Sequence, residues 1–329
     1  MGAIRTSIKY FYDVTSELVG IKSGLLLNQY QINQLLKENF TDDFLDIDDI
    51  NTGLRIRAED FEGKIKYIRI RIGNLPNKPR TFKSYQLLGQ YVNSQERLIE
   101  ISGLQSVLYS TLEKDLNLDL KEVKQFLYKD IIDKNTPEEI VDACIEITFE
   151  RIDESIIVPS SISWDGITSL SNLFNMEVKP VRDDDFLDQK FLDYLAVNGK
   201  DIENIHWRNF ERFCAQYFKK EGYEVVLGPG TNDGGVDIRV FDLEDKTKPS
   251  LLIQCKRYKD ENKISIETVK AFYTDVLFEG AKNGLIATTG FISKGGKKVC
   301  DIRDYNITFA EKSSIENWAK NMWTFSPLK

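Results

Sequence analysis

The fold of this chain is most constrained by two short segments that combine apolar residues with an acid, an amide and a lysine. The first reads Asn-Asp-Gly-Gly-Val-Asp-Ile at 232–238, so a glycine-rich turn delivers Asp237 at the start of an apolar run. The second, Leu-Ile-Gln-Cys-Lys at 252–256, is typical of a strand in which Gln254 and Lys256 share one face. Charged residues and Pro249 between the two segments predict an exposed hairpin connection. Two adjacent antiparallel strands would therefore bring Asp237 beside Gln254 and Lys256.

These three residue types together suit metal-assisted hydrolysis of a phosphodiester. A carboxylate and an amide oxygen are hard ligands of the kind that Mg²⁺ prefers. An ammonium group next to them can position or polarise an attacking water. The alternative is a hairpin whose polar face simply meets solvent.

Further blocks surround this pair in a fixed order along the chain: Phe210-Glu211, Gly222-Tyr223, Asp233 to Asp237, Gln254 to Tyr258 and Ala287 to Phe291. Together they resemble the catalytic domain of Mrr-like restriction endonucleases, within the PD-(D/E)xK nuclease superfamily. The resemblance covers roughly residues 200–305, about a third of the chain. It implies an α/β restriction-endonuclease-like fold with a mixed central sheet flanked by helices.

The resemblance also implies a role for each candidate residue. Asp237 and Gln254 are expected to be metal ligands, Glu211 to complete the site from a helix, and Lys256 to be catalytic. Mg²⁺ is the expected cofactor, with Mn²⁺ able to substitute. DNA is the expected substrate, in restriction or anti-phage defence. Gln254 stands where Glu is commoner in the superfamily, which removes one negative charge and predicts weaker metal affinity.

Several alternatives remain open at this point. The domain could cut RNA or branched DNA, or it could be an inactive nuclease fold that binds nucleic acid or supports an assembly. Glu211 could be a solvated residue at the edge of a helix stripe, and Asp233 could serve only its turn. Since cutting both strands needs two active sites or two events, a homodimer or higher oligomer is plausible.

Composition narrows the chemistry and the location. Hydrophobic residues make up 41% and charged residues 29% of 329 residues, which fits two globular domains. The four cysteines have no metal-like or disulfide-like spacing, and the single histidine, His206, rules out mechanisms that need paired histidines. We expect Cys255 to be buried and His206 to pack or cap at a helix start. The lack of a long apolar run predicts a cytoplasmic protein without membrane contact.

The net charge of −8 is unevenly distributed. Residues 200–329 carry 21 bases and 19 acids, or +2, whereas the rest carries 23 bases and 33 acids, or −10. The nuclease-like part is therefore mildly basic. Lys294, Lys297 and Lys298 could contact phosphates there, or could only solubilise the start of a helix.

A proline followed by an acidic run at 179–186 predicts a domain boundary, which gives an N-terminal domain at 1–185 and a nuclease domain at 186–329. In the second domain, apolar periodicity and turn residues predict strands at 223–227, 237–241, 252–256, 284–289 and 306–309. The same patterns predict helices at 186–197, around 210–218, 264–279, 294–303 and 313–323. We expect strand 284–289 to run parallel to the Gln254 strand, since a helix connects them.

The N-terminal domain carries no recognised motif, and an α+β fold is expected for it. Alternation at 54–57 and 68–72 predicts a β-hairpin that holds Arg55, Arg57, Arg69 and Arg71 off its apolar face. This face could contact DNA, or it could be a solvent face balanced by nearby acids. Helices are predicted at 29–39, at 120–133 and from a Thr136 cap to about 151. The domain's role could be recognition, sensing or partner binding.

Overall fold

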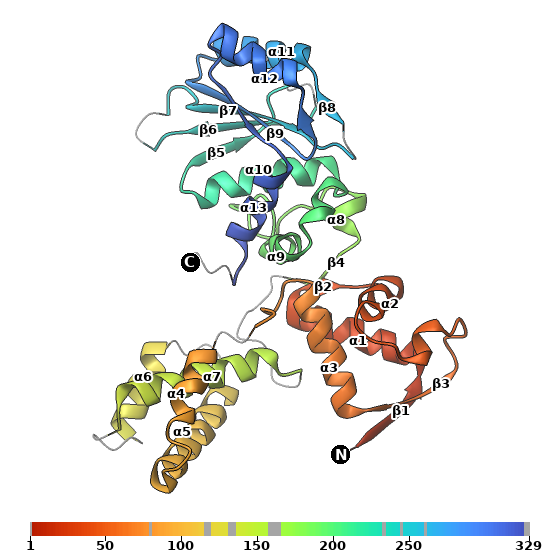
Figure 1. Cartoon of the computed structure of the whole chain (residues 1–329), viewed down its shortest axis with the longest axis vertical. Coiled ribbons are helices and arrows are strands. Elements are labelled where there is room, and N and C mark those ends of the chain that lie inside the picture. The colour runs from red at the N-terminus through yellow and green to blue at the C-terminus, as the bar shows by residue number, and fades with distance from the viewer. Residues whose placement is uncertain are drawn as a thin grey trace. The chain divides into compact units, whose positions relative to one another are not determined.

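The structure is a computed structural model that describes residues 2–78, 81–114, 120–130, 136–156, 166–231, 235–243, 246–259 and 262–325. The chain forms two compact units, each described here by itself (Figure 1). The first unit comprises Met1–Gly24, Gln29–Ile70 and Leu75–Trp164, and the second comprises Leu25–Asn28, Arg71–Asn74 and Asp165–Lys329. Residues 165–185 thus lie in the second unit, whereas the sequence-based division places them in the first domain. That the two units are separate functional domains stays a prediction.

The second unit is built on a five-stranded mixed sheet in the order β11-β9-β7-β6-β5. Strands β5, β6 and β7 are antiparallel neighbours, whereas β7, β9 and β11 run parallel to one another. The expected mixed sheet, the hairpin and the parallel crossover are therefore confirmed. The strand bounds are β5 Glu224–Leu227, β6 Ile238–Phe241, β7 Leu251–Lys256, β9 Asn283–Thr288 and β11 Ile307–Ala310.

Helices cover both faces of this sheet (Figure 1). On one face α11 (Ile266–Phe278) and α12 (Lys294–Arg303) cover an apolar core that contains Leu252, Phe272 and Ile286. The other face is covered by α10 (Trp207–Lys220) and α13 (Lys312–Met322), and α9 (Gln189–Val197) packs against α13. The smaller elements of the unit are β2 Leu25–Leu26, β4 Thr168–Ser169, α8 Asn172–Asn175, η2 Gly199–Glu203, β8 Lys263–Ile264 and β10 Phe291–Ile292.

Helix α10 forms where the apolar spacing predicts it. Phe210, Phe213 and Cys214 are fully buried, as expected for residues three to four positions apart on one helix face. The imidazole Nδ1 of His206 accepts a hydrogen bond from the backbone N–H of Arg208 at 3.3 Å. His206 is therefore a helix cap, as expected.

The first unit contains a two-stranded antiparallel ribbon, β1 (Ala3–Ser7) with β3 (Gly53–Arg57), together with helices. The predicted hairpin of 54–57 with 68–72 is wrong, because 68–71 belong to α3 (Ala58–Arg71). Phe61, Ile65 and Ile68 are buried along α3 at helical spacing, and this burial outweighs the local alternation. The other helices are α1 Ile8–Ser23, α2 Gln29–Lys37, η1 Asp43–Asp46, α4 Phe82–Gly89, α5 Gln95–Lys114, α6 Leu120–Asp130 and α7 Glu138–Glu154.

Helix α7 begins differently from the sequence expectation. Pro137 precedes its first residue, and Thr136 does not cap the helix. Instead, the Thr136 hydroxyl hydrogen-bonds the carboxylate of Glu100 on α5. The residue before Pro137 is thereby joined to α5 through a charged acceptor, which makes a strong hydrogen bond. The predicted end of the preceding helix, at 131–133, lies outside the described residues.

A glycine near the start of the second unit provides a test of the packing. Gly73 has φ +80°, and a Cβ added to it would lie 2.0 Å from the carbonyl oxygen of Asp193. We expect Gly73→Ala to lower the free energy of unfolding by about 2–4 kcal/mol, because it adds both left-handed strain and overpacking. Gly63→Ala in α3 is the control: its Cβ meets nothing within 4 Å, so we expect no loss of stability. Urea unfolding measures both, and equal midpoints would contradict the packing described.

Candidate active site

Asp237 is fixed against strand β7 by two backbone contacts. Its N–H donates to the carbonyl of Ile253 at 3.0 Å, and its Oδ2 accepts from the N–H of Cys255 at 2.6 Å. The antiparallel register pairs Ile238 with Ile253, and continuing it by one residue puts Asp237 opposite Gln254. Asp237 and Gln254 are each only 7% exposed. The two side chains predicted to share an ion therefore lie on neighbouring strands at matching positions.

Gln254 has one end of its amide satisfied and the other not. Its Nε2 donates to the carbonyl of Gly235 at 2.8 Å. Within the described part of the chain, its Oε1 is buried and has no hydrogen-bond partner. Gly235 has φ +92°, and a Cβ there would lie 3.1 Å from the amide nitrogen, so glycine is required at this approach. A buried amide oxygen without a donor beside a carboxylate fits a divalent cation.

Glu211 lies on α10, where Arg208 holds its carboxylate. The Arg208 Nη1 lies 2.6 Å from Oε2 of Glu211, and both side chains are about nine-tenths buried. Arg208 Nη2 donates to the carbonyl of Gly228 at 2.6 Å, and the N–H of Gly228 donates to the carbonyl of Asp237 at 2.7 Å. Arg208 thus connects the helix carboxylate to the turn that carries Asp237. The spacing of three residues between Arg208 and Glu211 in a helix is a sequence signal for this pairing.

The Cys255 thiol on β7 lies in surroundings that disfavour its charged form. Burial raises the pKa of the Cys255 thiol well above its usual value, and the Cys214 thiol and the carboxylates of Asp237 and Glu211 raise it further. Cys255 is 8% exposed and lies on the strand face opposite to Gln254, so its expected burial is confirmed. Its thiol stays protonated at neutral pH, which makes it a packing group and not a metal ligand.

Lys256 is the last residue of β7 and is partly exposed. Its carbonyl accepts from the Thr288 hydroxyl at 2.7 Å, while the Thr289 hydroxyl accepts from the N–H of Tyr258 and donates to its carbonyl, both at 2.8 Å. The two buried threonines therefore hold the backbone that carries Lys256 against the end of β9. This bracing was not apparent from strand propensity.

The remaining predicted residues are placed elsewhere. Lys294, Lys297 and Lys298 are exposed on α12, and Lys297 forms an ion pair with Glu311 at 2.6 Å. Asp233 lies outside the described residues. Their contact with phosphate or metal stays a prediction.

The four arginines expected on one hairpin face are also separated. Arg55 and Arg57 are exposed on β3, and Arg71 is half-buried at the end of α3. Arg69 is 1% exposed and donates to the carbonyls of Asp153 and Glu154, at 2.7 and 3.2 Å. Burial lowers the pKa of Arg69 to about 10. The expectation that Arg69 projects from a polar face is therefore wrong, because its guanidinium joins α3 to the end of α7.

The residues predicted to hold a metal, Asp237, Gln254 and Glu211, would carry little negative charge. Among the described residues, no three His, Cys, Asp or Glu side chains gather as a cation site. The set presented here has two carboxylates and one amide oxygen, and one carboxylate already faces Arg208. Any divalent ion bound there would be held by fewer negative charges than in a site with three acids.

Part of the second unit matches a known protein family. Residues 202–319 match the family model described as a restriction endonuclease, the Mrr catalytic domain. The resemblance to Mrr-like enzymes is confirmed for this segment. The second unit thus contains a restriction-endonuclease-like nuclease domain, whereas the family model leaves the N-terminal residues unassigned.

Individual relatives are distant. The chain is 24% identical over 122 residues to the uncharacterized protein y4cE of Sinorhizobium fredii, covering 37% of this chain and 31% of that protein. It also matches the structure of the MspJI restriction endonuclease in complex with a 27-mer oligonucleotide, at 17% identity and a TM-score of 0.29, over 42% of this chain and 32% of that one. The chain therefore spans about a third of the length of each. Within the described residues, no helix is both long and apolar enough to cross a bilayer.

The Gln254 oxygen and the Asp237 carboxylate generate a prediction about metal binding that is independent of cleavage. We expect Mg²⁺ or Mn²⁺ to stabilise the native chain by about 1.4 kcal/mol when the free ion is at ten times its dissociation constant. Asp237→Asn should abolish this gain, while Asp301→Asn, an exposed acid on α12, should keep it. Thermal unfolding with and without the ion measures the effect. A metal-induced shift that survives in Asp237→Asn would place the ion elsewhere.

Proposed function

We propose that this protein is a metal-dependent endonuclease that hydrolyses phosphodiester bonds in DNA. The observation that carries the proposal is the pairing of Asp237, pinned to β7, with the unsatisfied buried oxygen of Gln254. Both residues lie within the segment that matches restriction endonucleases. A polar group left unsatisfied in a buried site costs about 1–3 kcal/mol, a cost that a bound cation would relieve.

Asp237 and Gln254 would hold the ion, with Glu211 as a further ligand. We propose Mg²⁺, with Mn²⁺ as a substitute, because every donor in the set is a hard oxygen. A bound divalent ion supplies charge stabilisation at the phosphate and lowers the pKa of a coordinated water. The backbone N–H of Cys255 and the guanidinium of Arg208 keep the two carboxylates in place. The site is thereby preorganised before substrate arrives.

Lys256 is the proposed source of positive charge from the chain itself. Its backbone is fixed by Thr288, while its side chain is partly exposed and able to reach a phosphate. The ammonium group would neutralise negative charge that develops on the scissile phosphate and orient the attacking water. Because this charge develops mainly in the transition state, Lys256 should affect turnover more than metal affinity.

The wider setting follows from the same family likeness. We propose a role in restriction or defence against foreign DNA inside the cell, with two copies acting together to cut both strands. The N-terminal unit would recognise the target or restrain the enzyme. Asn209 on α10 donates to the carbonyls of Leu173 and Met176, each at 2.8 Å, which supports a catalytic unit that begins upstream of residue 186.

Two substitutions test the assigned chemistry. Asp237→Ala removes the principal anionic ligand, and we expect cleavage of plasmid DNA to fall by at least about 100-fold. Lys256→Ala should lower turnover by a similar factor while retaining the metal-induced thermal shift, since its role is charge stabilisation. Cleavage rates of the full chain at saturating Mg²⁺ measure both effects.

The matched control is Lys270→Ala, which removes an exposed lysine from α11. It should cut like the native chain. Unchanged cleavage in Asp237→Ala would overturn the site. Loss of the metal-induced shift in Lys256→Ala would show that the lysine is structural. Parallel assays on single-stranded DNA and RNA identify the preferred substrate, and preference for RNA would contradict the DNA assignment.

A further inference from the structure

The ribbon of β1 and β3 has two chemically different faces. In the antiparallel register Ile4 lies opposite Ile56 and Thr6 opposite Leu54, and these residues form the inner face. This face packs on the first unit at Ile56, which is only 7% exposed, and is more open at Ile4, which is 37% exposed. The other face consists of three further pairs: Ala3 with Arg57, Arg5 with Arg55, and Ser7 with Gly53. It therefore presents three arginines surrounded by small residues.

Arg5 and Arg55 are direct cross-strand neighbours of like charge. Such a pair destabilises a sheet, since the two side chains lie about 5 Å apart at their Cβ atoms. Both residues are exposed. Within the described part of the chain, neither guanidinium forms a hydrogen bond or an ion pair. No short-range pattern in the sequence indicates Arg5, because its partner strand is distant along the chain.

Two acids near this face are already paired with lysines. Asp42 forms an ion pair with Lys64 at 2.9 Å, and Asp46 with Lys37 at 2.7 Å. Among the described residues, Asp60 forms an ion pair with an arginine of the row, at 3.7 Å from Arg57, and both side chains are largely exposed. An exposed pair at that distance contributes little. The positive charge of the row therefore remains available to an external anion.

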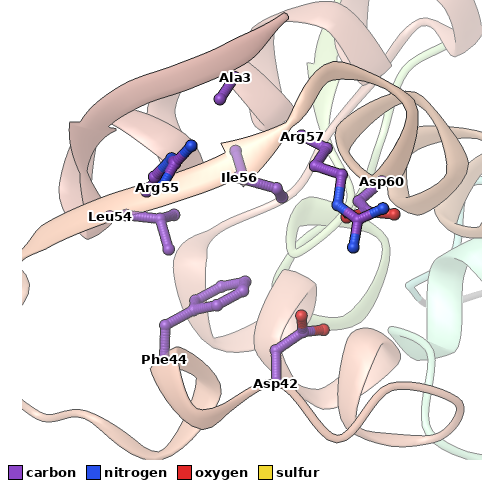
Figure 2. Close-up of a pocket in the computed structure, with 8 residues that line it drawn as sticks. All are labelled: Ala3, Asp42, Phe44, Leu54, Arg55, Ile56, Arg57 and Asp60. Carbon is purple, nitrogen blue, oxygen red and sulfur yellow. The ribbon is translucent and has the colours of Figure 1, made fainter. Parts of the chain in front are cut away.

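Two arginines of the row also border a pocket beside β3. The pocket has a volume of about 330 Å³ and is lined by Arg55 and Arg57 together with Asp42, Asp60, Phe44 and Leu54, among others. Figure 2 shows Leu54 directed toward Phe44, whereas Arg55 lies across the strand from it and Arg57 extends toward Asp60. Arg5, Arg55 and Arg57 are all exposed, and together they form an arginine ridge on this face of the ribbon.

We propose that this ridge, formed by Arg5, Arg55 and Arg57, is a binding surface for double-stranded DNA. A two-stranded ribbon fits the major groove, which is about 12 Å wide. Guanidinium groups suit both phosphates and the guanine edge, because their donors are planar and paired. Arg55 and Arg57 are about 7 Å apart along the strand, close to two base-pair steps of a duplex. The inference goes beyond the proposed cleavage site and takes from it only the choice of DNA as the anion.

The test measures DNA binding by the full chain in EDTA, where cleavage does not interfere. The variant is Arg5→Thr with Arg55→Thr, since threonine keeps strand propensity and removes both charges. We expect the dissociation constant for a labelled duplex to rise at least about 10-fold at 0.15 M salt, and the slope of log K against log salt to fall by about 1.8. Fluorescence anisotropy across a salt series measures both quantities.

Control variants separate binding from folding. Arg151→Gln removes an exposed arginine at the end of α7 and should leave the dissociation constant unchanged. The double threonine variant should unfold at the same urea concentration as the native chain or a higher one, because it relieves a like-charge pair. Lysine at both positions should restore the salt slope. If the double lysine variant folds but keeps the reduced slope, the slope did not come from charge at these positions and the proposal fails.

The outcomes are distinguishable from those of the cleavage proposal. At saturating Mg²⁺ and over a range of DNA concentrations, the double threonine variant should retain kcat and show a higher KM. Native-like affinity and salt slope in that variant would overturn the ridge as a DNA surface, whether or not the chain cuts. Equal displacement of the duplex by poly-glutamate would show a surface for acidic polypeptides and would also overturn it. A chain that binds through the ridge but never cuts would refute only the cleavage site.

Discussion

The hydrogen bond from the Cys255 N–H to the Asp237 carboxylate is the contact on which the candidate site depends. It joins the residue just before β6 to the C-terminal end of β7, and so fixes where the acid lies relative to Gln254 and Lys256. Because the donor is a backbone group in a sheet, its position is set by the whole ladder and not by one rotamer. β9 extends this support, since it pairs with β7 from Leu251 to Lys256. The sheet therefore fixes the position of the Asp237 carboxylate.

Such a site is costly for stability. Asp237, Glu211 and Arg208 are all less than a tenth exposed, where charges lose much of their hydration. Each finds partners: a backbone N–H for Asp237, Arg208 for Glu211, and the Gly228 carbonyl for Arg208. The Gln254 oxygen lacks one, as do six further buried side-chain atoms among the described residues. The Gln254 oxygen lies where we expect a cation. In a structural ion pair, by contrast, both partners are satisfied.

The sequence predicted the second unit well because its signals are local and agree with one another. The turn glycines, the alternation at 252–256 and the helix ending before Gly280 each favour the element found. The prediction for the first unit was wrong where strand-like alternation competes with helical spacing of the apolar residues. Ile68, Ile70 and Ile72 alternate like a strand, yet Phe61 and Ile65 continue the same apolar face at helical spacing. The true partner of β3 is β1, a non-local pairing that no short-range pattern reveals. The bracing threonines were missed for the same reason, whereas the spacing of Arg208 and Glu211 is local.

Arginine illustrates how environment, and not residue type, decides function in this chain. Arg69 is buried and satisfied by carbonyls, so it acts as a structural link. Arg208 is buried and paired with Glu211, so it positions an acid. Arg5 and Arg55 are exposed, opposed to each other and surrounded by small residues. Only in the last arrangement would an external anion lower the free energy of the folded chain, because binding would remove a repulsion that folding creates. A polyanion that satisfies several guanidinium groups at once would do so most effectively.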